Sequence, residues 1–117
     1  MGNFNNLVVW QRSKDLAVRI FRYSQKDGIK WNFGYKDQLL RASLSIPSNI
    51  AEGEQLDTDR QSVKHFYIAR GSAAELHTLL IIGLEVGYFS GELVKEMEQD
   101  IRYISVGLTN LIRSRCD

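Results

Sequence analysis

Apolar residues in this 117-residue chain recur at intervals of three and four through most of its length. The pattern is plainest toward the C-terminal end, in a run of six side chains: Val94, Met97, Ile101, Ile104, Leu108 and Leu111. Alternating steps of three and four align side chains along one face of an α-helix, whereas a half-buried strand repeats every two residues. The sequence therefore predicts an all-α fold.

Four segments carry this helical pattern, over about residues 8–26, 35–54, 58–86 and from 90 onward. Thr58 and Ser90 are suited to cap the third and fourth helices, because their hydroxyls can accept bonds from free backbone donors. Short connections make successive helices neighbours, which predicts an antiparallel up-down-up-down four-helix bundle. Pro47 lies inside the second helix, where its ring and missing N–H predict a kink and not a break. Residues 1–117 are expected to form a single domain.

Composition excludes several classes of function. No run of about 18 apolar residues is available to span a membrane, and the first ten residues lack the layout of a signal peptide. The single cysteine, Cys116, cannot form an internal disulfide or a multi-cysteine zinc site. The chain has no Gly-rich phosphate loop, nucleophile elbow or zinc-ligand spacing. We expect a soluble cytoplasmic protein with no metal and no cofactor.

Charge is divided between the two halves of the chain. Residues 1–50 carry 8 Lys and Arg against 3 Asp and Glu, and residues 51–117 carry 7 against 11. Four cations lie opposite the apolar face of the first helix: Arg12, Arg19, Arg22 and Lys26. Such a stripe can neutralise phosphates and release counterions, so these four are candidate nucleic-acid-binding residues. The alternative is an ordinary solvated helix surface.

Two aromatic residues fall outside the helical core pattern. Trp31 and Phe33 lie in the expected loop after the first helix, beside Lys30 and Lys36. A loop aromatic next to cations can stack on a nucleic-acid base or pack against an adjacent subunit. The sequence leaves both readings open.

Three blocks of sequence resemble a known family, and they occur in its order: LVVWQRSKDLA at 7–17, QLLRASLSIPSNIAEG at 38–53 and HFYIARGSAAEL at 65–76. The resemblance is to the four-helix-bundle proteins encoded in intervening sequences of large-subunit ribosomal RNA genes, which include accessory proteins of diversity-generating retroelements. It implies a non-enzymatic protomer that assembles into a homopentamer. It also implies a basic surface that meets RNA, DNA or a reverse transcriptase. Residues 28–38, GIKWNFGYKDQ, depart from the family pattern.

Four polar residues stand among small and apolar neighbours in the matching blocks: Arg41, Asn49, Glu52 and Glu75. Buried charges must be paired and hydrogen-bonded, so we expect these residues to form a buried structural cluster in which arginine meets glutamate. A ligand-binding or catalytic site is the alternative reading.

The pattern gives little support to an enzyme. Arg60 and His65 have a spacing that resembles the short motif of helical HEPN ribonucleases, but two residues at this distance occur often by chance. Glu75 and His77 are two apart, so they cannot supply the inward Glu-x-x-His pair of a di-iron bundle. The favoured reading is a non-catalytic scaffold. A purely structural or protein-binding bundle is the first alternative, and a HEPN-like ribonuclease is the second.

Overall fold

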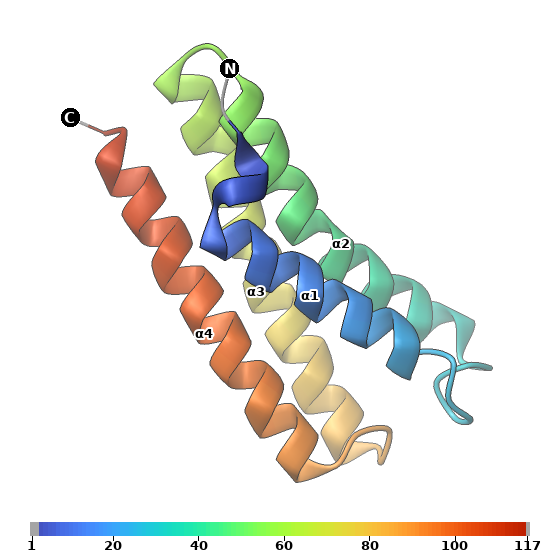
Figure 1. The fold of residues 1–117 in the computed structure, drawn as a ribbon. Coiled ribbons are helices and arrows are strands. Elements are labelled where there is room, and N and C mark those ends of the chain that lie inside the picture. Colours follow the sequence, from blue (N-terminus) through green and yellow to red (C-terminus); the bar gives the residue numbers. More distant parts are fainter. Residues whose placement is uncertain (1–2, 117) are drawn as a thin grey trace.

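The computed structural model describes residues 3–116 of the chain, and the regular structure in this range is all helical. A short 3₁₀ helix, η1 (Phe4–Asn6), precedes four α-helices: α1 (Val8–Tyr23), α2 (Phe33–Gln55), α3 (Asp59–Glu85) and α4 (Gly91–Ser114). Figure 1 shows the α2–α3 connection at one end of the molecule and the other two connections at the opposite end. Each helix packs on the next, and α1 also contacts α4. The prediction of an all-α fold with four helices is confirmed.

Side-chain caps set the starts of three helices. The hydroxyls of Thr58 and Ser90 accept hydrogen bonds from the backbone N–H groups of Gln61 and Leu93, as the sequence predicts. Asn32 caps α2 in the same way, so this helix begins at Phe33 rather than near Tyr35.

The first helix is three residues shorter than predicted. It ends at Tyr23, and Lys26 lies in the connection to α2. The chain turns at Gly28, where φ is +96°, and then buries Ile29 to 2% exposure. A helix continued to Lys26 would leave too little chain to make that turn and place Ile29 in the core.

All four helices contribute to one apolar core. Its largest fully buried side chains are Phe66, Leu16, Ile20, Ile29, Leu39, Ile46, Ile50, Leu76, Leu80, Met97, Ile104 and Leu108. The apolar stripe predicted on α4 is buried along most of its length, but Ile112 replaces Leu111 at the end. An α-helix has 3.6 residues per turn, so a strict seven-residue repeat drifts around it and the last buried position shifts.

Glycine permits close contact at two points. A Cβ atom on Gly53 would lie 2.7 Å from the Phe66 ring, and one on Gly83 would lie 2.5 Å from Tyr35 Oη. The run of small residues in α3 divides between two faces. Ala69 and Ala73 are fully buried, whereas a Cβ on Gly71 would meet no atom within 4 Å.

Pro47 lies within α2 without interrupting it, since the helix is continuous from Phe33 to Gln55. The expectation that proline does not break this helix therefore holds, and the kink stays a prediction. None of the helices in residues 3–116 is both long enough and apolar enough to cross a membrane.

Candidate functional site

Acidic residues of α4 partly neutralise the predicted basic stripe on α1. Arg12 Nη1 lies 3.6 Å from Asp100 Oδ1, and the Arg19 guanidinium lies 3.8 Å from both Asp100 and Glu96. The Arg12 guanidinium also stacks 4.4 Å above the Tyr103 ring. These contacts are long and partly exposed, so each stabilises the fold weakly. They nevertheless reduce the positive potential that Arg12 and Arg19 present to a phosphate.

The other two predicted cations are not held by carboxylates. Arg22 and Lys26 are exposed, and no carboxylate of residues 3–116 lies within 4 Å of either charge. Lys26 Nζ instead lies 4.3 Å above the Tyr23 ring. The cations of this stripe that no carboxylate contacts therefore lie in the last turn of α1 and in the connection that follows it.

An apolar groove of about 680 Å³ runs between η1, α1 and α2. Phe4, which is part of the groove lining, packs edge-on against Trp10, with ring centroids 5.0 Å apart. Residues of both helices line the groove: Phe4, Trp10, Lys14, Ala17, Val18, Phe21, Arg22, Leu44, Pro47, Ser48 and Ala51. Its walls are apolar, and the two cations, Lys14 and Arg22, both come from α1.

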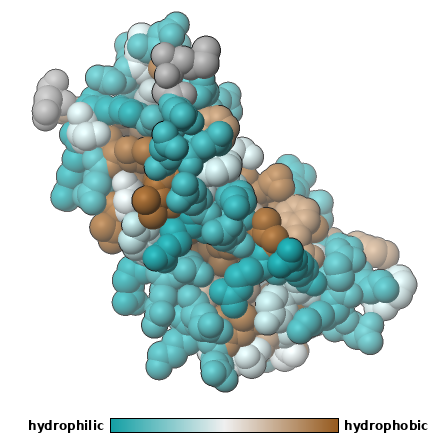
Figure 2. Space-filling view, viewed as in Figure 1, coloured by the Kyte–Doolittle hydropathy of each residue, from teal (hydrophilic) through white to brown (hydrophobic). Residues whose placement is uncertain are grey.

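A second groove, of about 420 Å³, lies between the start of α1 and the last turns of α4. It is lined by Leu7, Val8, Val9, Tyr103, Val106, Gly107, Asn110, Leu111 and Ser114. Figure 2 shows apolar surface on both flanks of α1, separated by the polar side chains of that helix. Uncovered apolar surface beside one helix is typical of a surface that meets another molecule.

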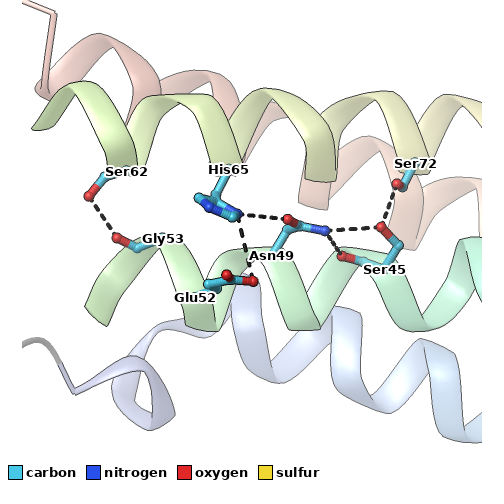
Figure 3. A network of polar contacts seen from close by, with 7 residues as sticks. All are labelled: Ser45, Asn49, Glu52, Gly53, Ser62, His65 and Ser72. Carbon is cyan, nitrogen blue, oxygen red and sulfur yellow. Dashed lines mark hydrogen bonds and ion pairs between the residues drawn. The ribbon is translucent and has the colours of Figure 1, made fainter. Parts of the chain in front are cut away.

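A polar network joins α2 to α3 (Figure 3). His65 Nδ1 lies 2.9 Å from Asn49 Oδ1, and the Asn49 amide donates to the carbonyl and hydroxyl oxygens of Ser45. Ser72 donates to the same hydroxyl at 2.8 Å. Glu52 stays at the edge of the network, 3.8 Å from His65.

The structure does not bury the expected four-residue cluster. Asn49 and Glu52 meet at His65, but the Arg41 side chain is 81% exposed and lies 3.8 Å from Asp37, one turn earlier in α2. Glu75 is exposed as well. No ion pair within 4 Å joins Arg41 to Glu75 in the described chain. Small serine side chains fill the inner positions where the charges were expected.

The structure places the two candidate catalytic residues in different surroundings. Arg60 is exposed in the first turn of α3, whereas His65 faces α2 and bonds to Asn49. Between residues 3 and 116, no group of three or more His, Cys, Asp or Glu side chains is arranged to hold a metal ion. His77, the other histidine, bonds Glu98 of α4 at 2.6 Å.

Comparison with known proteins then identifies the family. Residues 5–110 match the family described as "23S rRNA-intervening sequence protein". The chain belongs to this family.

No curated protein shows a significant match. Among solved structures, the fold resembles a crystal structure from Bacteroides thetaiotaomicron VPI-5482, titled as a protein with unknown function from the S23 ribosomal protein family. The two chains share 27% identity with a TM-score of 0.82, over 90% of this chain and 98% of the other.

The sequence did not predict the contacts between residues of this intervening-sequence family protein that lie far apart in the chain. Arg115 Nη2 lies 2.5 Å from Glu54 Oε1, linking the end of α4 to the end of α2, and its guanidinium covers the Phe66 ring. The opposite charges of the two halves of the chain were the available signal for the α1–α4 pairs. No comparable pattern marks Glu54 and Arg115, which are 61 residues apart.

Proposed function

We propose that this intervening-sequence family protein is a non-catalytic, homo-oligomeric scaffold that contacts nucleic acid through the basic end of α1. The observation that carries this proposal is the pair of apolar grooves flanking α1. Two separate grooves on one protomer suit a head-to-tail contact, in which different surfaces of neighbouring copies meet and a ring can close. The family resemblance implies five subunits.

The bundle within each subunit is proposed to be antiparallel, with an up-down-up-down order of helices and a kink in α2 at Pro47. Pro47, Leu44 and Ala51 all line the larger groove, which supports a role for this part of α2 in shaping the contact. A kink would change the curvature of the groove wall and hence the angle at which a neighbouring copy docks.

The nucleic-acid contact is assigned chiefly to Arg22 and Lys26. Arg12 and Arg19 contribute less, because their charges face Asp100 and Glu96. A fivefold ring would repeat the basic end of α1 and raise the effective concentration of weak phosphate contacts. The partner is RNA or DNA, presented alone or together with a reverse transcriptase.

A purely structural or protein-binding bundle is the alternative function. The same neutralisation of Arg12 and Arg19 favours the alternative, since it weakens the basic stripe and leaves two uncovered apolar grooves beside α1. The two functions differ in their response to salt: phosphate contacts weaken steeply as ionic strength rises, whereas apolar docking does not.

The experiment measures binding of a labelled structured RNA by the full chain across a salt series, with native mass determined by light scattering on the same sample. An oligomer whose affinity for RNA falls steeply as the salt concentration rises supports the scaffold. The double variant Arg22→Gln, Lys26→Gln should make this fall in affinity less steep. The matched control is Arg12→Gln with Arg19→Gln, which should reduce the steepness less. An oligomer with no affinity for RNA or DNA at low salt points to the protein-binding function.

A further inference from the structure

The connection between α1 and α2 is held rigidly against the neighbouring helices. Ile29 anchors it in the core, and the Asn32 amide donates to Tyr88 Oη at 2.8 Å while Asn32 Oδ1 caps α2. Tyr35, in the first turn of α2, packs on Tyr88 with ring centroids 5.1 Å apart. Figure 1 shows this connection projecting at the end of the bundle. Its backbone is therefore positioned before any partner arrives.

Two aromatic side chains are exposed here, Trp31 from the connection and Phe33 from the first residue of α2. Trp31 is 66% exposed and Phe33 is 69% exposed, the two highest values among the exposed large apolar residues. Exposing an indole to water is unfavourable, and ordering the segment that bears it adds a conformational cost. A rigid segment that keeps both rings outside the core is suited to stacking against a flat partner.

The charge around these rings is positive. Lys30 Nζ lies 5.0 Å from the centre of the Trp31 ring, and Lys36 begins the next turn of α2. Arg22 lies in the last turn of α1, and Lys26 lies in the connection itself. Asp27 is the carboxylate within it, and Asp37 of α2 lies beside Arg41. Residues 22–37 thus carry four cations and two carboxylates.

We propose that Trp31, assisted by Phe33, is a stacking site for an unpaired nucleotide base, with Lys30 and Lys36 contacting the flanking phosphates. This inference rests on the proposed nucleic-acid function and narrows its ligand to single strands. Bases in a duplex are stacked on one another, so their faces are closed to an indole, whereas unpaired bases can stack on aromatic side chains. The occupant is a single-stranded nucleic acid and not a second copy of the chain, because a phosphate backbone complements the positive charge of this segment.

The test compares a labelled 20-nucleotide uridine strand with an RNA hairpin, using wild type, Trp31→Ala and Trp31→Phe. Wild type should bind the single strand more tightly than the hairpin. Trp31→Ala should weaken single-strand binding about tenfold, with an unchanged salt slope and little effect on the hairpin. Trp31→Phe keeps an aromatic face and should recover part of the affinity.

Tyr67→Ala is the matched control, because Tyr67 is also an exposed aromatic with a cation above it, Arg70, at 4.8 Å. It lies on α3, and its removal should leave both affinities unchanged.

Trp10 is the other tryptophan, so a Trp10→Phe variant reports on Trp31 alone. In this variant, the uridine strand should quench the fluorescence of Trp31 and the hairpin should not.

The stacking site is overturned if Trp31→Ala binds the single strand as tightly as wild type does, or if the single strand does not quench Trp31 fluorescence. Binding of the hairpin by wild type would still leave the proposed nucleic-acid function in place. A wild-type oligomer that binds neither probe at low salt overturns both. A fall in native mass in Trp31→Ala, without RNA binding by wild type, assigns Trp31 to a contact between subunits and also overturns the inference.

Discussion

Asn49 and His65 hold each other across the α2–α3 interface, with 2.9 Å between Oδ1 of the amide and Nδ1 of the imidazole. The Asn49 NH₂ group already donates to the carbonyl and hydroxyl oxygens of Ser45, so its oxygen is left to accept. Nδ1 of His65 therefore carries the proton. His65, whose spacing from Arg60 resembles a ribonuclease motif, thus contributes a hydrogen bond to the packing of α2 against α3.

Replacing Asn49 with alanine should destabilise the protein by about 1–2 kcal/mol, because it leaves the half-buried His65 donor without its acceptor and removes the bonds that Asn49 donates to Ser45. Urea unfolding at a fixed protein concentration measures the change. Thr78→Ala, which removes an exposed hydroxyl bonded to Ala74 O, is the control and should change stability by less than about 0.5 kcal/mol. Equal stability of Asn49→Ala and wild type would contradict a structural role for the network.

Gly83 and Gly71 should respond oppositely to alanine. A Cβ on Gly83 meets Tyr35 Oη at 2.5 Å and the Phe89 ring at 2.6 Å, so Gly83→Ala should cost about 1–3 kcal/mol of stability. Gly71→Ala meets nothing within 4 Å and should stabilise α3 by up to about 1 kcal/mol through helix propensity. Thermal unfolding of the two variants gives the comparison. The packing account fails if Gly83→Ala is the more stable of the two.

Tyr35 should make stability fall at high pH. Burial raises its pKa from 10.0 to about 12, and the neighbouring Tyr88 adds to the rise. A phenol whose pKa is higher in the folded state stabilises that state fully below pH 10, and the contribution is lost as pH rises toward 12. Tyr35→Phe lacks its hydrogen bond to Leu79 O, so it should be about 1 kcal/mol less stable at pH 8.

The difference between wild type and Tyr35→Phe should therefore shrink between pH 10 and pH 12. Denaturant unfolding at pH 8, 10 and 11.5 measures it. Parallel stability curves for the two proteins across that interval would show that Tyr35 ionises equally in the folded and unfolded chains.

The ion pair between Glu54 and Arg115 should matter more than an exposed pair. Glu54 is 11% exposed and Arg115 is 24% exposed, so Glu54→Gln should cost about 1–3 kcal/mol by weakening a charged hydrogen bond. Asp37→Asn, at the exposed pair with Arg41, is the control and should cost less than about 0.5 kcal/mol. Urea unfolding compares them, and similar losses in both variants would contradict the importance of burial.

Local patterns in the sequence predict the helices but not their partners. The apolar period places the core face of α4, and the hydroxyls of Thr58 and Ser90 locate two helix starts, because both signals depend on neighbours a few residues away. The partner of Arg19 lies on α4, more than 75 residues later, so only the folded arrangement of α1 and α4 reveals that its charge is partly neutralised.

The prediction for Arg41 shows a second limit. A charged residue among small neighbours indicates that its surroundings are tightly packed, but not which flank of the helix it occupies. Ser45, one turn later, takes the inner position against Ser72, while Arg41 lies outside. The larger apolar groove likewise cannot be predicted from the sequence, because its walls combine residues from η1, α1 and α2.

The most direct test of the scaffold is the native mass of the full chain by light scattering, for wild type, Leu44→Lys and Val86→Lys. Leu44 lines the larger groove, whereas Val86 is 60% exposed at the end of α3 and lines neither groove. We predict a wild-type mass of about five chains, a smaller mass for Leu44→Lys and an unchanged mass for Val86→Lys. A monomeric wild-type protein at the same concentrations would contradict the account.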